Sequence, residues 1–62
     1  MTKSEITFIK SKIDEFRKYA NEDFISARRE SDPHEKEHLD FQSRLNDCAA
    51  NTLENLLGEL LA

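Results

Sequence analysis

The spacing of apolar residues in the first half of the chain constrains its fold most strongly. Apolar side chains recur there at steps of three and four residues, the spacing that places them on one face of an α-helix. Thr2 and Glu5 have the spacing of a capping box, in which each side chain accepts a hydrogen bond from an otherwise unpaired amide. We therefore predict a helix over about residues 3–30, with a heptad line made of Ile6, Ile9, Ile13, Phe16, Ala20, Asp23 or its neighbour Phe24, and Ala27.

Asp32 and Pro33 mark a second boundary. Proline disfavours a helical conformation in the residue before it, yet it suits the first position of a helix. Asp32 is a preferred N-cap residue, and Glu35 lies where the helix dipole favours an acid. These signals predict a turn at residues 31–32 and a second helix over about residues 33–61. A break near Asn21 is the alternative, but the heptad line continues through that segment.

The second helix carries an apolar stripe that covers about half of its circumference at 100° per residue. Its members are Phe41, Leu45, Cys48, Ala49, Thr52, Leu53, Leu56, Leu57 and Leu60. Two helices of equal length joined by a short turn form an antiparallel hairpin. One partner helix cannot cover so wide a stripe, so a second copy should dock on it.

The fold class predicted is therefore all-α, an antiparallel two-helix hairpin that dimerises into a four-helix bundle. A tetramer and a hetero-complex remain alternatives. The chain of 62 residues has one cysteine, Cys48, so no intrachain disulfide supports its small core and association is the remaining source of stability. Cys48 itself is expected to be a small buried side chain. We predict that the core and dimer interface contain Ile6, Ile9, Ile13, Phe16, Leu45, Leu53, Leu56 and Leu60.

Charge is distributed unevenly along the chain. Residues 1–30 carry a net charge of +1 and residues 31–62 a net charge of −5. Nonspecific DNA binding depends on neutralising phosphates and is disfavoured for such a surface. No stretch is apolar enough for a membrane span, and the first residues lack the order of a signal peptide. We expect a cytoplasmic protein without a cofactor.

The segment His34-Glu35-Lys36-Glu37-His38 fits the H-E-x-x-H pattern of zinc peptidases. A catalytic zinc also needs a third protein ligand, an open coordination position and a cleft that admits substrate. The chain has only two histidines, and a helical hairpin offers no cleft walls. We therefore predict that this protein is not an enzyme. The two histidines are expected near the turn, packed beside Phe24 and Ala27 with their ring nitrogens in water.

Four residues of the first helix lie off its heptad line and are predicted to bind a partner: Phe8, Lys12, Tyr19 and Ile25. Exposed aromatic rings interleaved with cations suit a protein groove. They also suit stacking on nucleic-acid bases. A third interpretation is that Phe8 covers the terminal leucines of the second helix.

The layout resembles the Rop family of plasmid copy-number regulators. The chain has a similar length, opens with Met-Thr-Lys, and has two heptad-bearing helices, a short acidic turn and one cysteine in the second helix. The resemblance implies an antiparallel four-helix-bundle dimer whose first helices bind paired RNA loops. The counterparts of the RNA-binding residues would be Phe8, Lys3, Lys10 and Lys12.

The stretch MTKSEITFIKSKIDEFRKYANEDF is also similar in texture to small early-region open reading frames of lambdoid phages. That likeness implies a non-enzymatic accessory protein that binds a host or phage factor. The function predicted is thus a homodimeric regulatory protein that binds a protein partner. The alternative is an RNA-binding regulator of the Rop type.

Overall fold

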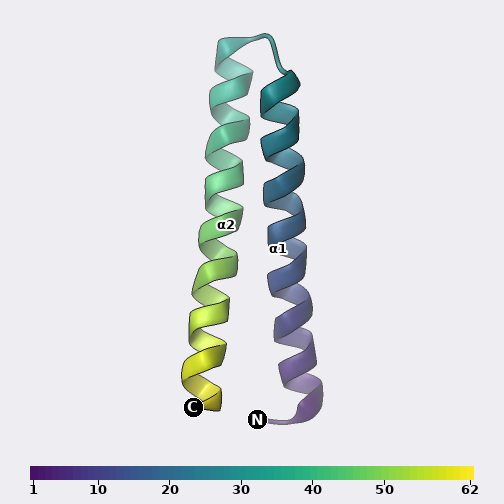
Figure 1. Cartoon of the computed structure of the whole chain (residues 1–62), viewed down its shortest axis with the longest axis vertical. Coiled ribbons are helices and arrows are strands. Elements are labelled where there is room, and N and C mark those ends of the chain that lie inside the picture. The colour runs from purple at the N-terminus through teal and green to yellow at the C-terminus, as the bar shows by residue number, and fades with distance from the viewer.

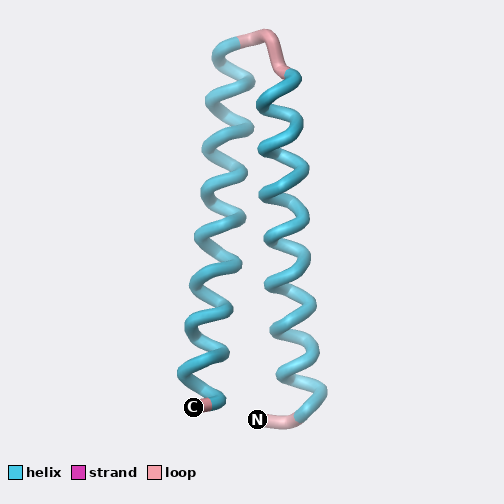
Figure 2. The backbone as a smooth tube through the Cα atoms, viewed as in Figure 1, coloured by secondary structure: helices cyan, strands magenta, loops and turns pink.

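The computed structural model describes all 62 residues and contains two helices and no strand. Helix α1 spans Lys3–Arg29 and helix α2 spans Pro33–Leu61. The helices run antiparallel, with both chain ends at one end of the hairpin, here called the open end, and the turn at the other (Figures 1 and 2). The predicted hairpin is confirmed, and its long axis measures 46 Å.

Both ends of α1 are held by local hydrogen bonds. At its start the Glu5 amide donates to Thr2 Oγ1 over 3.2 Å and the Thr2 amide donates to Glu5 Oε1 over 3.0 Å, which confirms the predicted capping box. The helix ends at Arg29, one residue earlier than predicted, because Glu30 leaves the helical conformation. The Glu30 carboxylate then accepts from the amides of the next two residues, which fixes the turn.

Helix α2 begins as its sequence predicts. The Asp32 carboxylate accepts a 3.0 Å hydrogen bond from the amide of His34, and Pro33 occupies the first turn. Proline has no amide proton to leave unpaired there, and its fixed φ already suits a helix. The alternative break at Asn21 is wrong, since α1 passes through this position without interruption.

The contact between the helices changes in character along the hairpin. Near the open end it is apolar, with Ile13, Ala50 and Leu57 buried and with four partly buried side chains packed on them: Ile6, Ile9, Phe16 and Leu53. Near the turn the buried residues are small: Ala20, Ala27 and Ser43. Only six of the 62 residues are buried, so most of the apolar side chains remain outside this core.

Helix α2 turns one edge of its predicted stripe, with Leu53 and Leu57, toward α1, together with residues outside that stripe. The line that contacts α1 includes Ser43, Asn46 and Ala50, none of which belongs to the predicted interface. Ser43 and Asn46 are polar, so a search for apolar periodicity does not identify them. The larger part of the predicted apolar stripe consequently faces away from α1.

The predicted interface residues therefore divide into two groups. Those in the hairpin contact are Ile6, Ile9, Ile13, Phe16 and Leu53. Leu45, Leu56 and Leu60 are exposed and lie outside the core of the single chain. Their place in a dimer interface stays a prediction.

Candidate functional site

The largest candidate interaction surface is a line of exposed side chains on α2. We call it the outward stripe; it consists of Phe41, Leu45, Cys48, Thr52, Leu56 and Leu60. Four of these are large apolar residues, with exposed fractions between 49% for Leu56 and 57% for Phe41. At 100° per residue the stripe is centred about 160°, nearly half a turn, from the line through Ser43 and Ala50 that contacts α1. Helix α2 therefore has two apolar sides, and the bulkier one has no partner within the chain.

The outward stripe continues onto α1 across one broad side of the hairpin. Tyr19 and Asp23 of α1 line a shallow hollow together with Gln42, Leu45 and Asn46 of α2. Two of these lining residues are joined across the helices, since the Asn46 side-chain amide donates over 3.1 Å to an Asp23 carboxylate oxygen. Leu45 and the half-exposed ring of Tyr19 thus belong to the same surface.

The opposite side of the hairpin is polar. There the Arg17 guanidinium lies 2.8 Å from a Glu54 carboxylate oxygen and also donates to the side-chain oxygen of Asn51 over 3.3 Å. These three side chains join α1 to α2 across the surface. Charged and polar side chains thus connect the two helices on this side.

The accessible surface of the chain is larger than its mass requires. The chain exposes 4907 Å². A compact monomer of 7.2 kDa exposes about 4,100 Å² by the usual scaling of area with mass. The excess is about 800 Å², the share that each partner contributes to a protein interface of standard size. The elongated hairpin, with extents of 46 × 16 × 10 Å, therefore exposes more surface than a compact chain of the same mass.

The predicted partner-binding residues of α1 are all at the surface, but they do not form one patch. Phe8 is 61% exposed, and Tyr19 and Ile25 are exposed as well. Lys12 places its ammonium 5.4 Å from the centre of the Phe8 ring and 3.1 Å from a Glu15 carboxylate oxygen. Ile25 lies about a third of a turn around the helix from Tyr19. It belongs to a separate part of the α1 surface.

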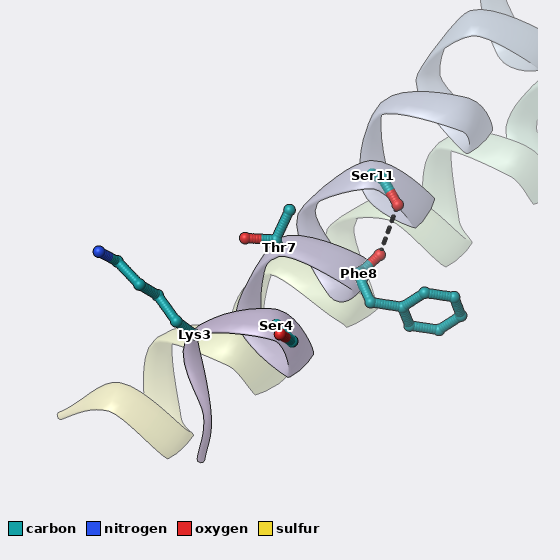
Figure 3. Close-up of a pocket in the computed structure, with 5 residues that line it drawn as sticks. All are labelled: Lys3, Ser4, Thr7, Phe8 and Ser11. Carbon is teal, nitrogen blue, oxygen red and sulfur yellow. Dashed lines mark hydrogen bonds between the residues drawn. The ribbon is translucent and has the colours of Figure 1, made fainter.

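A shallow hollow at the start of α1 is lined by Lys3, Ser4, Thr7, Phe8 and Ser11. Figure 3 shows that the Lys3 side chain and the Phe8 ring point away from each other, with the hydroxyl groups between them. The Ser11 hydroxyl is already engaged, since it donates over 2.7 Å to the Phe8 carbonyl oxygen. The hollow is an open surface depression with one cation at its edge.

The two histidines of the zinc-peptidase pattern are exposed next to the turn. His38 Nε2 lies 3.0 Å from the side-chain nitrogen of Gln42, one turn along α2. The chain contains no group of three or more His, Cys, Asp or Glu side chains arranged to hold a metal ion. His34 shares a shallow surface hollow with Pro33 and three charged neighbours.

Two placements differ from the sequence-based expectation. Cys48 was expected to be buried, but it is a free and exposed thiol because the stripe that contains it faces outward. Phe24 was an alternative member of the α1 heptad line, but it is 47% exposed and lies beneath the Arg28 guanidinium at 5.4 Å. Ala20 and Ala27 are seven residues apart, so the heptad line between them can pass through either Asp23 or Phe24. Only the hydrogen bond from Asn46 to Asp23 reveals which of them faces α2.

Neither helix is long and apolar enough to cross a membrane. Comparison with protein-family models, with curated proteins and with solved structures gives no match. The surfaces described above are therefore the basis for any functional assignment.

Proposed function

We propose that this chain is a small interaction protein that acts as a homodimer and binds a protein partner through α1. The observation that carries the proposal is the outward stripe of α2. Its four large apolar residues are about half exposed, while only six residues of the chain are buried. Exposed apolar surface of this extent on a small chain is typical of a protein–protein contact. Pairing of two hairpins through this side produces an assembly of four helices, as expected from the sequence.

Size supports the same proposal. A two-helix chain of 62 residues buries little apolar surface, and it has no disulfide to offset the conformational entropy of folding. A second copy that covers the outward stripe buries additional apolar surface without a longer chain. A symmetric dimer is also the commonest way in which soluble chains associate.

Sedimentation equilibrium tests the dimer. Wild-type protein should sediment as a dimer at micromolar concentration, and Leu45→Glu should raise the dissociation constant by at least about tenfold. Burying a leucine contributes about 1.5–3 kcal/mol, and each 1.4 kcal/mol is a factor of ten in affinity. Ile25→Glu is the matched control, because Ile25 is also an exposed apolar residue but lies on α1. A wild-type sample that is monomeric at millimolar concentration would contradict the proposal.

The partner surface is proposed to lie on α1, where Tyr19 adjoins the outward stripe at Leu45 while Phe8 and Ile25 lie outside it. Phe8, Tyr19 and Ile25 are exposed there, and Lys12 lies over the Phe8 ring. Exposed aromatic side chains are the residues that contribute most to protein interfaces. The phage-like texture of the first residues favours a host or phage factor as the partner.

Affinity capture with two single variants tests this surface. A true partner should be retained by wild type and lost by Phe8→Ala or Ile25→Glu while the dimer stays intact. Leu61→Ala is a suitable control, since Leu61 is an exposed apolar residue at the end of α2. A protein retained equally by all of these variants would not be a partner bound by α1.

The RNA-binding alternative has one supporting observation. Lys12 and Phe8 form a cation–π pair beside a hollow lined by Lys3 and hydroxyl groups, and no acidic residue lines that hollow. An aromatic ring flanked by lysines can stack on a base and contact phosphates. A gel-shift titration with paired RNA loops should then show affinity that falls steeply with salt and is lost in Phe8→Ala and Lys12→Ala. Binding that these two variants leave unchanged would exclude this site.

A further inference from the structure

The apolar residues on the exposed side of α2 are arranged symmetrically about one point of the helix. Leu45 and Leu56 lie at equal distances from the bond between Ala50 and Asn51, and so do Phe41 and Leu60 farther out. The small residues Ala49 and Thr52 occupy the corresponding inner pair. From either end of α2, the side chains on this side follow the same order of size: two large, two small and two large.

Such a pattern is self-complementary for one arrangement of two copies. In a two-fold symmetric interface, if residue i contacts residue j of the second copy, then residue j contacts residue i. We infer that α2 packs antiparallel on α2 of a second copy, with the two-fold axis crossing between Ala50 and Asn51 and the two turns at opposite ends. The inference rests on the proposed dimer and specifies its orientation and register.

The contacts in this arrangement match in size and polarity. Leu45 packs on Leu56 of the second copy, and Phe41 packs on Leu60 of the second copy. Near the axis the small Ala49 lies against Thr52, which lets the two helices approach closely. The Thr52 hydroxyl already donates over 2.8 Å to the Cys48 carbonyl oxygen within its own helix. Burying Thr52 therefore leaves no unpaired donor at the centre of the interface.

The competing two-fold arrangement places both turns at the same end and lays α2 on α1 of the second copy. Near the turn, the same side of α1 carries Asp23 and Ser26, and Glu30 follows the end of the helix. Phe41 and Leu45 of α2 would then be buried against polar and acidic groups, which costs free energy unless each group finds a hydrogen bond. Pairing α2 with α2 avoids this mismatch and leaves α1 at the flanks of the dimer.

Cysteine cross-linking tests the register in a Cys48→Ala background. Leu45→Cys and Leu56→Cys proteins are prepared separately and then mixed under mild oxidation. A disulfide should form in the mixture and not in either protein alone, because only residues 45 and 56 of different copies face each other. Asp47→Cys mixed with Glu54→Cys is the matched control. These positions have the same symmetry about the axis but lie on the polar side of α2, so no cross-link is expected.

A second measurement leaves the paired residues Phe41, Leu45, Leu56 and Leu60 unchanged. Ser31 is exposed in the turn, so a spin label on Ser31→Cys in the Cys48→Ala background reports the distance between the two turns. Turns at opposite ends should give a separation comparable with the 46 Å length of the hairpin. A short distance between the turns would overturn the inferred orientation, and so would a disulfide between two Leu45→Cys chains. Neither result would contradict the dimer itself. Monomeric Cys48→Ala protein in sedimentation would instead overturn the proposed function, and with it this inference.

Discussion

The Ser43 hydroxyl of α2 donates a hydrogen bond of 2.8 Å to the Ala20 backbone carbonyl oxygen of α1. A serine side chain is short, so the two helix backbones must lie close together at this level. Ala27 and Ala50 are almost fully buried along the same contact, which is consistent with such an approach. Close approach through small residues leaves no space for larger side chains in the turn half of the hairpin.

Ser43→Leu should therefore destabilise the protein although it makes the helix contact more apolar. Overpacking a tight contact costs about 1–3 kcal/mol, and the hydrogen bond to Ala20 is lost as well. Urea unfolding followed by circular dichroism measures the change. Ser26→Leu is the control, because Ser26 is exposed on α1 and its replacement should have little effect. Equal stability of the two variants would show that the helices have room to separate at Ser43.

Leu56 and Leu57 are adjacent in sequence but differ in exposure, at 49% and 6%. Leu57→Ala should lower the free energy of unfolding by about 2–5 kcal/mol at every protein concentration, because it leaves a cavity in the hairpin core. Leu56→Ala should have a small effect in dilute solution and a larger one at high concentration, where the dimer forms. Thermal melts over a hundredfold range of concentration separate the two effects. A concentration-independent loss for both variants would contradict the assignment of Leu56 to a dimer contact.

The capping box makes the start of α1 sensitive to acid. Hydrogen bonds from the Thr2 backbone amide and then from the Thr2 side chain hold the pKa of the Glu5 carboxyl below its ordinary value. A group with a lowered folded-state pKa contributes stability that is present above its unfolded pKa and is lost as the pH falls through its folded pKa. The first turn of α1 should therefore fray on acidification below about pH 4–5.

An NMR titration of the Glu5 carboxyl carbon, with amide exchange in the first turn, checks this expectation. Glu5→Gln keeps an acceptor for the Thr2 amide but cannot titrate, so exchange in its first turn should lose this pH dependence. A Glu5 pKa at or above that of an ordinary glutamate would show that the capping box is not formed in solution.

The ion pair between Arg17 and Glu54 should contribute little to stability despite its length of 2.8 Å. Both side chains are more than a third exposed, and water and salt screen such pairs. A double-mutant cycle with Arg17→Ala and Glu54→Ala should give a coupling energy of about 1 kcal/mol or less, falling as salt is added. A larger coupling that persists in high salt would mean that the pair is shielded, for example by a partner on the polar side.

Local signals in the sequence placed the helix ends with an error of at most one residue. Thr2 with Glu5 at one boundary and Asp32 with Pro33 at the other act through atoms a few residues apart. Such interactions are decided before any tertiary contact forms. The α1 contact line was predictable for a similar reason, since α1 has a single apolar line and that line packs on α2.

Helix α2 was less predictable because it has two apolar sides. Periodicity identifies residues that share a face, but it does not say which face meets the neighbouring helix. The sequence predicted one wide stripe, which included Leu45, Leu56 and Leu57, and did not indicate which part of it would contact α1. The hairpin uses the side with Ser43 near the turn and Ala50 farther along α2, where small side chains let the backbones approach.

The amino-acid sequence by itself thus determined two capped helices, their lengths, the turn and the face of α1 that packs, because all of these depend on local geometry. Only the tertiary structure decided which side of α2 is buried, and hence that Phe41, Leu45, Leu56 and Leu60 are left exposed. The physical reason is that two helix backbones approach most closely where the side chains between them are smallest. A search for hydrophobic residues does not detect that property.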